Sequence, residues 1–396
     1  MGIRVGLGIS TEKDTLQAAQ AAARQAKAGI GQEKIDLAIV FGSTRFSHPT
    51  ALKTLSATLG AVPMIGSSGT AIISNKGILT HGIIVLLLGL PSGIYLNTAL
   101  ASQISKKAPA SAGEELGEKL LFGFKEIRRD LGVIFSDGLI KDETAFLFGL
   151  QERLGKSFPL AGGSVFDNIS SQKTHLFFDG ELHSDAASGM LWGGKLNFGL
   201  GVKHGWKPLG KPRYVTKASG STVYEIDGAP AVNIYQDYFG FNLAQLTQEL
   251  KRISVFYPIG IRLAGEEEYL LRNILSIEEG GALSFQGNVP EASLVRLMIA
   301  TKDSCLIATR QAVEEVKKGL LGRPCNFVLV FESVSRYILL GRQAAKELEI
   351  IQEGLGKDTP LVGIYTFGEE APLKSINYQG KAYFHNQAIS VLGIGG

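Results

Sequence analysis

Short apolar runs alternate with longer amphipathic stretches along most of the chain. Three of these runs, rich in Leu and β-branched residues, end in Phe and are followed about one helix length later by a Pro that opens another apolar run. The stretches between them have helical spacing and end in Gly, a common helix stop. The pattern therefore predicts three β-α-β units. The three Phe residues are Phe41, Phe135 and Phe331, and the three Pro residues are Pro63, Pro159 and Pro360.

The resemblance between the three segments extends in both directions. Upstream of each lies an apolar run and a helical stretch, and downstream lie a Gly turn, a His and another apolar run. We therefore expect an α/β fold with mixed sheets, built from about three pseudo-repeated β-α-β-α-β-hairpin units near 2–89, 93–202 and 293–395. Chance similarity of short runs is the alternative, but the matched order and spacing favour a repeat. The segment 203–292 breaks the pattern and is interpreted as a connector, so that residues 293–300 open the third unit.

Composition narrows the class of protein. The 396 residues are 45% hydrophobic, include 49 Gly and carry a net charge of +3, which is typical of a compact globular protein and identifies no partner. The longest apolar run, residues 82–90, is too short to span a bilayer, and the N-terminus has no signal-peptide pattern. With two distant cysteines, Cys305 and Cys325, we expect a cytoplasmic protein without a membrane partner.

Motifs for common chemistries are missing from the sequence. It has no Walker A motif, and the six His residues have no metal-ligand spacing, so neither a cofactor nor a metal is expected. Between Asp185 and Glu225 there is no acidic residue but there are six basic ones. A solvated basic face is the favoured interpretation, a site for an anionic ligand is the alternative, and a nucleic-acid partner is not expected.

The loops that follow the second apolar run of each unit differ in chemistry. Equivalent loops of pseudo-symmetric copies can meet at one cavity, so their polar residues are candidates for ligand binding. They are Ser67, Ser68, Asp167, Asn168, Tyr365 and Glu369. For an amino-acid ligand, Arg272 with Asn273 suits the carboxylate and Glu369 the ammonium group, although an ion pair of Arg272 with Glu267 or Glu268 remains an alternative. His385 and Asn386 form a polar cluster before a buried strand and are further candidates.

An ordered set of motifs resembles the FIST family, named for F-box and intracellular signal transduction proteins. The set includes DLAIVFGS, VPMIGSSGTA, FSDG, LAGGSVFDN, KHGWKPLG, EYLLRNIL, FQGNVPEA, YTFGEEAP and FHNQAISVLG. The resemblance implies an N-terminal FIST region over 1–222, with two α/β units, and a C-terminal region over 223–396, with the connector helix and the third unit. Relatives commonly carry F-S-C-x-x-R where this chain has FESVSR, so Ser333 replaces the Cys and Arg336 is kept.

The resemblance also implies a function, an intracellular sensory module for small ligands, with amino acids or related small anionic metabolites as the favoured class. Relatives often carry an output domain; none is recognised here, so a signalling protein partner in trans is expected. The alternative is an enzyme acting on a small acyl or amino compound, with Asp137, Glu369 or His385 as acid or base. A third interpretation is a pure interaction module, expected if no enclosed cavity exists. Asp137 and Arg336 complete the set of candidate ligand-binding residues.

Overall fold

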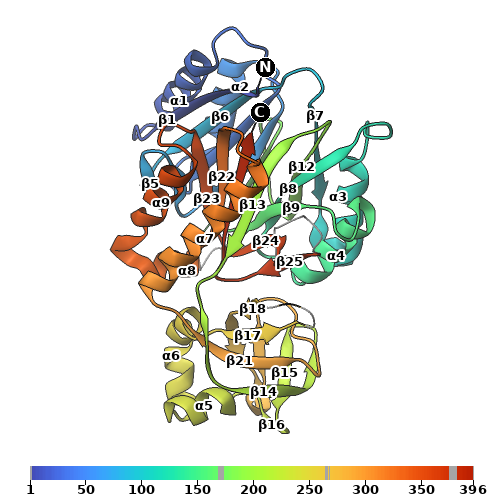
Figure 1. The fold of residues 1–396 in the computed structure, drawn as a ribbon, viewed down its shortest axis with the longest axis vertical. Helices are drawn as coiled ribbons and strands as arrows, with labels where there is room; N and C mark the ends of the chain where they lie inside the picture. The colour runs from blue at the N-terminus through green and yellow to red at the C-terminus, as the bar shows by residue number, and fades with distance from the viewer. Residues whose placement is uncertain (1, 168–173, 264–265, 267, 374–380, 396) are drawn as a thin grey trace.

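The computed structural model describes residues 2–167, 174–263, 266, 268–373 and 381–395. It contains three six-stranded mixed sheets in one body and an eight-stranded sheet in a smaller domain, which lies below that body in Figure 1. Helices pack on the sheets of the body, so the predicted α/β class with mixed sheets is confirmed.

The first sheet contains most of the first unit. Its order is β1 (Arg4–Ser10), β6 (Ile83–Gly89), β2 (Leu37–Ser43), β3 (Met64–Gly69), β10 (Leu176–Phe178) and β11 (Glu181–His183). β2 and β3 are parallel, with Phe41 paired to Ser67, and β6 runs antiparallel to both β1 and β2. Two helices belong to this unit, α1 (Thr15–Ile30) and α2 (His48–Leu59). Their apolar faces pack with outward-facing residues of the sheet.

The second and third sheets repeat this strand order. The second contains β25 (Ala382–His385), β24 (Gly368–Pro372), β9 (Leu160–Val165), β8 (Arg129–Asp137), β12 (Ala186–Gly193) and β7 (Tyr95–Ser102), with α3 (Pro109–Leu120) and α4 (Glu143–Leu154) beside it. The third contains β13 (Asn197–Lys203), β26 (Ile389–Gly395), β22 (Cys325–Ser333), β23 (Leu361–Thr366), β4 (Ile72–Ser74) and β5 (Gly77–Leu79), with α7 (Lys302–Leu320), α8 (Val334–Leu340) and α9 (Ala345–Leu355). In each sheet, the first strand of the unit lies beside its last strand, the last strand beside the second, and the second beside the third.

Each unit gives its hairpin to another unit's sheet. The hairpin β4–β5 of the first unit pairs with β23, β10–β11 of the second pairs with β3, and β24–β25 of the third pairs with β9. Every sheet is thus completed by backbone hydrogen bonds from a different part of the chain. The three units therefore depend on one another for their edges and form one body rather than three independent domains.

The centre of the body is an apolar core enclosed by the three sheets. The rings of Phe41 and Phe135 lie 5.9 Å apart between centroids, and those of Phe135 and Phe331 lie 5.6 Å apart. These Phe residues occupy equivalent positions on β2, β8 and β22, and all three belong to this central core. The residues just before them, such as Val40 and Ile134, face the helices instead, because side chains alternate along a strand.

The predicted start of the third unit is wrong. Residues 294–299 form β21 (Leu294–Ile299), which pairs with β14 and β17 of the small domain, whereas the first strand of the third unit is β13. The place of β13 as the first strand is supported by the close approach of its backbone to a helix. A Cβ on Gly199 or Gly201 of β13 would lie about 2 Å from a carbonyl oxygen of α7, just as one on Gly6 or Gly8 of β1 would meet α1. The small domain is therefore inserted between the first strand and first helix of the third unit.

The inserted domain has its own apolar core. Its sheet contains β18 (Tyr269–Arg272), β17 (Ile259–Arg262), β21, β14 (Lys207–Ser219), β15 (Thr222–Ile226), β20 (Leu283–Phe285) and β19 (Ile274–Ile277), with β16 (Ala229–Pro230) on β15. Two helices, α5 (Asn233–Phe239) and α6 (Leu243–Phe256), complete it. The chain enters this domain after β13 and leaves it before α7, and these two elements lie side by side (Figure 1).

Candidate functional site

A pocket of about 480 Å³ lies at the carboxyl end of β8. It is enclosed by the segment 104–112, by the loop from β8 to α4, and by the turn before β12. Its apolar lining comes from Ile104, Pro109, Ala112, Leu139, Ile140 and Phe146, and its polar lining from Ser105, Lys107, Asp137, Lys141, Ser184 and Asp185. The carboxyl end of a strand flanked by helices is a common place for a ligand in α/β folds.

Two carboxylates in this pocket are held by backbone amides. Asp137, the last residue of β8 and 3% exposed, accepts hydrogen bonds from the backbone N–H of Leu139 at 2.9 Å and of Asp185 at 2.8 Å. Asp185 in turn accepts from the backbone N–H of Ser105 at 2.7 Å and from its hydroxyl at 2.8 Å. Neither carboxylate has a basic side chain within 4.0 Å in the part of the chain that the structure describes.

The pocket's two lysines differ in their surroundings. Lys107 forms an ion pair with Glu115 and donates to the backbone carbonyl of Ser102. Lys141 is exposed and has no hydrogen bond or ion pair among the described residues. The pocket therefore presents two fixed carboxylates, one free ammonium group at its edge and an apolar floor.

The corresponding ends of β2 and β22 are occupied by side chains. Beyond β2, the rings of Phe46 and His81 stack with centroids 4.4 Å apart, and His81 Nε2 lies 3.1 Å from the backbone oxygen of Glu12. Beyond β22, Arg336 occupies the space next to α7. In the described residues, side chains thus fill this strand end in the first and third units, whereas the second unit has an open pocket there.

A pair of buried glutamates lies next to Asp137. Ser136 Oγ is 2.6 Å from a carboxyl oxygen of Glu143, at the start of α4, and 2.6 Å from one of Glu370 on β24. Ser164 Oγ also contacts Glu143 at 2.8 Å. One hydroxyl has one proton to donate, so its second contact requires a protonated carboxyl group. Accordingly, burial and then the charge of Glu370 raise the pKa of Glu143, and burial raises the pKa of Glu370 to about 7.

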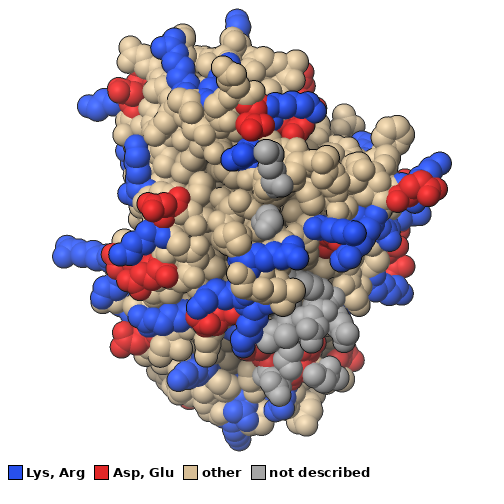
Figure 2. Space-filling view, turned by 45° about the horizontal axis from the view of Figure 1, so that its top comes forward, with Lys and Arg blue, Asp and Glu red and all other residues tan. Residues whose placement is uncertain are grey.

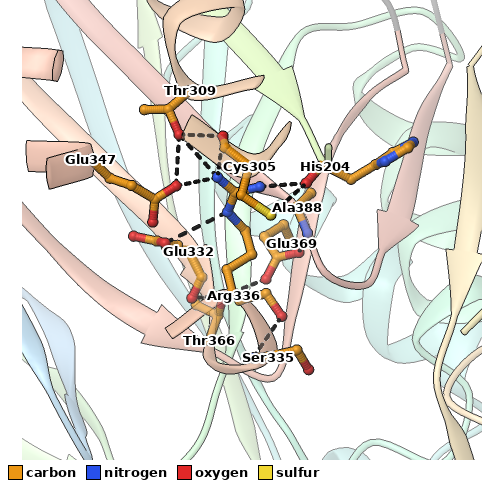
Figure 3. Close-up of polar contacts among 11 residues, drawn as sticks. His204, Cys305, Thr309, Glu332, Ser335, Arg336, Glu347, Thr366, Glu369 and Ala388 are labelled. Atoms are coloured by element: carbon orange, nitrogen blue, oxygen red, sulfur yellow. Dashed lines mark hydrogen bonds and ion pairs between the residues drawn. The ribbon is translucent and has the colours of Figure 1, made fainter. Parts of the chain in front are cut away.

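Arg336 forms the centre of a second buried cluster, shown in Figure 3. α8 begins directly after β22, and Ser333 caps it by accepting from the backbone N–H of Ser335. This abrupt turn points Arg336 toward α7 and α9, where it pairs with Glu347 and donates to Thr309 Oγ1 at 2.9 Å. It also donates to the backbone carbonyls of His204 and Cys305, which fixes the end of β13 against α7.

Glu332 Oε1 lies 3.6 Å from Arg336 Nε, beside the pair of Arg336 with Glu347. Burial and then the charge of Glu347 raise the pKa of Glu332 well above its ordinary value. Both Glu332 carboxyl oxygens and the Tyr365 hydroxyl have no hydrogen-bond partner within the described chain. Arg336 and Tyr365 therefore belong to the packing between β22, α7 and α9 and do not line the pocket of Asp137.

Arg272 and its neighbours join the small domain to the third unit's hairpin. Arg272 is buried and donates to the backbone carbonyls of Asn288 at 3.0 Å, Leu271 at 2.8 Å and Phe384 at 2.9 Å. Burial lowers its pKa to about 9. Within the described residues no ion pair joins this guanidinium to Glu268, and Glu267 lies outside them. Asn273 continues the junction, with its backbone N–H donating to Asn386 Oδ1 at 3.0 Å.

The loops expected to share one cavity lie together, because the third unit's β24 pairs with the second unit's β9 and a side-chain hydrogen bond joins the first and second loops. Ser68 donates to Asp167, which also lies 2.5 Å from His175 Nδ1, while the buried hydroxyl of Ser67 has no partner in the described chain. Glu369 accepts from Thr366 Oγ1 at 2.8 Å and from the backbone N–H of Ala388 at 3.0 Å. Asn168 lies outside the described residues. Of the predicted ligand residues that the structure describes, Asp137 lines the pocket.

Two of the candidate acid–base residues, Glu369 and His385, lie on adjacent strands but are not hydrogen-bonded to each other within the described residues. Glu369 has a pKa raised by burial to about 8, and His385 pairs with it in the β24–β25 ladder. The His385 ring, however, contacts the backbone oxygen of Ala371 at 2.9 Å, and burial lowers its pKa to about 3. No hydrogen bond joins the two side chains within the described ranges, and neither lines the pocket.

The basic stretch before Glu225 is partly neutralised by neighbouring acids. Lys203 lies 3.0 Å from both Glu268 and Glu315, and Arg213 lies 3.1 Å from Asp227. Figure 2 shows Lys and Arg interspersed with Asp and Glu over the face it displays. Among the residues described, no group of three or more His, Cys, Asp or Glu side chains could hold a metal ion.

Comparison with known proteins identifies the family. The FIST N domain matches residues 36–229 and the FIST C domain matches 231–372. The chain therefore belongs to the FIST family, whose domains are associated with sensory roles in signal transduction and with small-ligand binding. The helices that the structure describes include none long and apolar enough to cross a membrane.

Similar proteins in other organisms are uncharacterized. One from Methanocaldococcus jannaschii is 27% identical over 65% of this chain, which spans about half (51%) of that relative's length. One from Mycobacterium bovis is 23% identical over 95% of this chain and 96% of its own. Among solved structures, a chorismatase aligns over 100% of this chain and 99% of its own with a TM-score of 0.36 and 7% identity. A cyanuric acid hydrolase aligns over 100% of both with a TM-score of 0.37 and 9% identity.

Proposed function

We propose that this chain is a small-ligand-binding sensory module whose ligand, an amino acid or a related small metabolite, binds in the pocket at the carboxyl end of β8. The observation that carries the proposal is the pocket itself, because its volume of about 480 Å³ falls within the range of small-molecule sites. It combines fixed carboxylates, a free ammonium group and an apolar floor, which together suit a zwitterion with a side chain. The sensory association of FIST domains supports the same function.

The wall of the pocket offers a route for a signal. The loop from β8 to α4 lines the pocket at Leu139 and Lys141, and it then continues into contacts with the small domain. Asn288 of that domain donates to Asp142 Oδ2 at 3.3 Å, and its backbone N–H lies 3.5 Å from Thr144 Oγ1. A ligand that repositions this loop changes the contacts of the small domain. We propose that a signalling protein partner reads that change.

Native mass spectrometry of gently purified protein tests whether a small molecule is bound. A bound mass that disappears on denaturation, and is reduced in Asp137→Asn but not in Asp358→Asn, supports the proposal. Asp358 is exposed and does not line the pocket, so its variant matches the charge change. Protein that never carries or takes up any small molecule, from a lysate or from an amino-acid panel, contradicts it.

A further inference from the structure

We infer that the pocket recognises its ligand by a primary ammonium group attached to a compact apolar body, and that a carboxylate on the ligand is secondary. This inference rests on the proposed function, because it concerns the same pocket. It narrows the ligand to apolar amino acids and apolar primary amines, and it excludes small anions that lack an amine.

The fixed charges of the pocket favour a cation inside it. Asp137 and Asp185 each keep acceptor capacity after their hydrogen bonds to Leu139, Asp185 and Ser105, because every carboxylate oxygen can accept twice. A carboxylate that is removed from water without a cationic partner is unfavourable. An ammonium group, with three donors, supplies the missing charge and uses the remaining lone pairs.

The basic side chains of the pocket favour a bound anion less than its carboxylates favour a bound cation. Lys107 is held by Glu115, which Lys119 also contacts, and this leaves Lys141 as the lysine of the lining without a partner in the described chain. Lys141 is exposed, and ion pairs between exposed groups contribute little to affinity. A ligand carboxylate therefore adds less than the ammonium group between two held carboxylates.

The apolar lining favours an apolar body on the ligand beside its ammonium group. Ile104, Ala112 and Phe146 are buried beneath the pocket, and Leu139 at its edge is 53% exposed. A branched aliphatic or aromatic body that fills the pocket removes Leu139 from water, which favours binding in proportion to the apolar area covered. Small polar amines lack this contribution.

Calorimetric titration with three probes of similar shape separates the two recognition modes. The probes are L-leucine, 3-methylbutan-1-amine, which lacks the carboxylate, and 4-methylpentanoate, which lacks the ammonium group. We expect leucine and the amine to bind within about tenfold of each other and 4-methylpentanoate to bind at least roughly 30-fold more weakly, as for loss of a desolvated charge partner.

Variants assign these effects to side chains. Asp185→Asn should weaken both amine-containing probes, and Lys141→Gln should weaken leucine alone, by a few-fold. Leu139→Ala changes an exposed residue and should leave the melting temperature unchanged while weakening leucine several-fold and glycine not at all. Preferential binding of 4-methylpentanoate, or binding of none of the three probes, overturns the inference. A co-purified ligand seen by mass spectrometry in either case leaves the proposed function standing.

Discussion

The hydroxyl of Ser136 on β8 lies 2.6 Å from a carboxyl oxygen of Glu370 on β24, although 234 residues separate them in the chain. The contact exists because the third unit's hairpin completes the second unit's sheet. It places a carboxylic acid of the third unit against the carboxyl end of β8, the strand of the second unit that leads to the pocket. Proton binding at this contact is therefore coupled to the attachment of the hairpin.

Stability should fall as the pH rises past neutrality. Burial raises the pKa of Glu370 from 4.5 to about 7 and that of Glu369 from 4.5 to about 8. A carboxyl whose pKa is raised by folding contributes stability that is complete below about pH 4.5 and is lost as the pH rises through its folded-state pKa. Urea unfolding between pH 5 and 9 measures this loss, which for Glu370 is on the order of 3 kcal/mol.

The variant Glu370→Gln isolates this effect, because an amide has no proton to lose over this range. We expect its stability to depend less on pH than that of the wild type and to be the greater of the two at pH 9. Glu126→Gln, at an exposed site, serves as the charge-matched control and should keep the wild-type slope. An unchanged slope in Glu370→Gln contradicts the shared proton.

His385 should remain neutral throughout the physiological range. Burial lowers its pKa from 6.5 to about 3, and its Nε2 contact with a carbonyl requires the proton on that nitrogen. Because the folded-state pKa is depressed, the histidine stabilises the fold above about pH 6.5, and that stability is lost as the pH falls. NMR titration of the imidazole checks this assignment. A pKa near 6.5 would restore His385 as a candidate general base.

Replacing Arg336 should destabilise the fold. Arg336→Ala leaves Glu347 without its cation in a fully buried site, and breaking such a pair costs about 3–5 kcal/mol. Arg342→Ala, an exposed neighbour on the same segment, should change the free energy of unfolding by about 0.5 kcal/mol or less. Chemical denaturation compares the two. Normal stability together with lost ligand binding in Arg336→Ala would instead make Arg336 a ligand residue.

Replacing Arg272 should loosen the small domain without emptying the pocket. Arg272→Ala removes donors from three carbonyl groups at the junction with β25, and each buried acceptor left unpaired costs about 1–3 kcal/mol. Hydrogen exchange should increase in β18 and β25, while the affinity for the ligand stays close to that of the wild type. Loss of affinity with unchanged exchange would support the carboxylate-binding role expected from sequence.

The three repeated units could be predicted from the sequence, but the way they are connected and paired could not. Phe41, Phe135 and Phe331 lie in buried strands as expected, each two residues before the last residue of its strand, since period and spacing are local properties. The start of the third unit was missed because an inserted domain separates β13 from its helix, although the Gly-Leu-Gly at 199–201 matches that at 6–8 and is the signal for it. The exchange of hairpins produces no periodic pattern in the sequence, because strand pairing between units depends on tertiary packing.

The candidate site was predictable at one residue. Asp137 stands two residues after Phe135, the end of an apolar run, and the end of such a strand is where ligand residues gather. Asp185 was missed because it precedes a strand and reaches the pocket only through pairing of β12 with β8. The backbone partners of Arg272 could not be predicted, since nothing in a sequence distinguishes an arginine that binds a ligand from one that binds backbone carbonyls.

Calorimetric titration of an amino-acid panel into wild type, Asp137→Asn and Asp358→Asn determines whether the ligand binds between Asp137 and the apolar floor of the second unit. Circular dichroism melting curves establish that each variant is folded. We expect saturable binding of apolar amino acids to the wild type and to Asp358→Asn, with affinity reduced at least about 30-fold in folded Asp137→Asn. Equal affinity in all three proteins would contradict it.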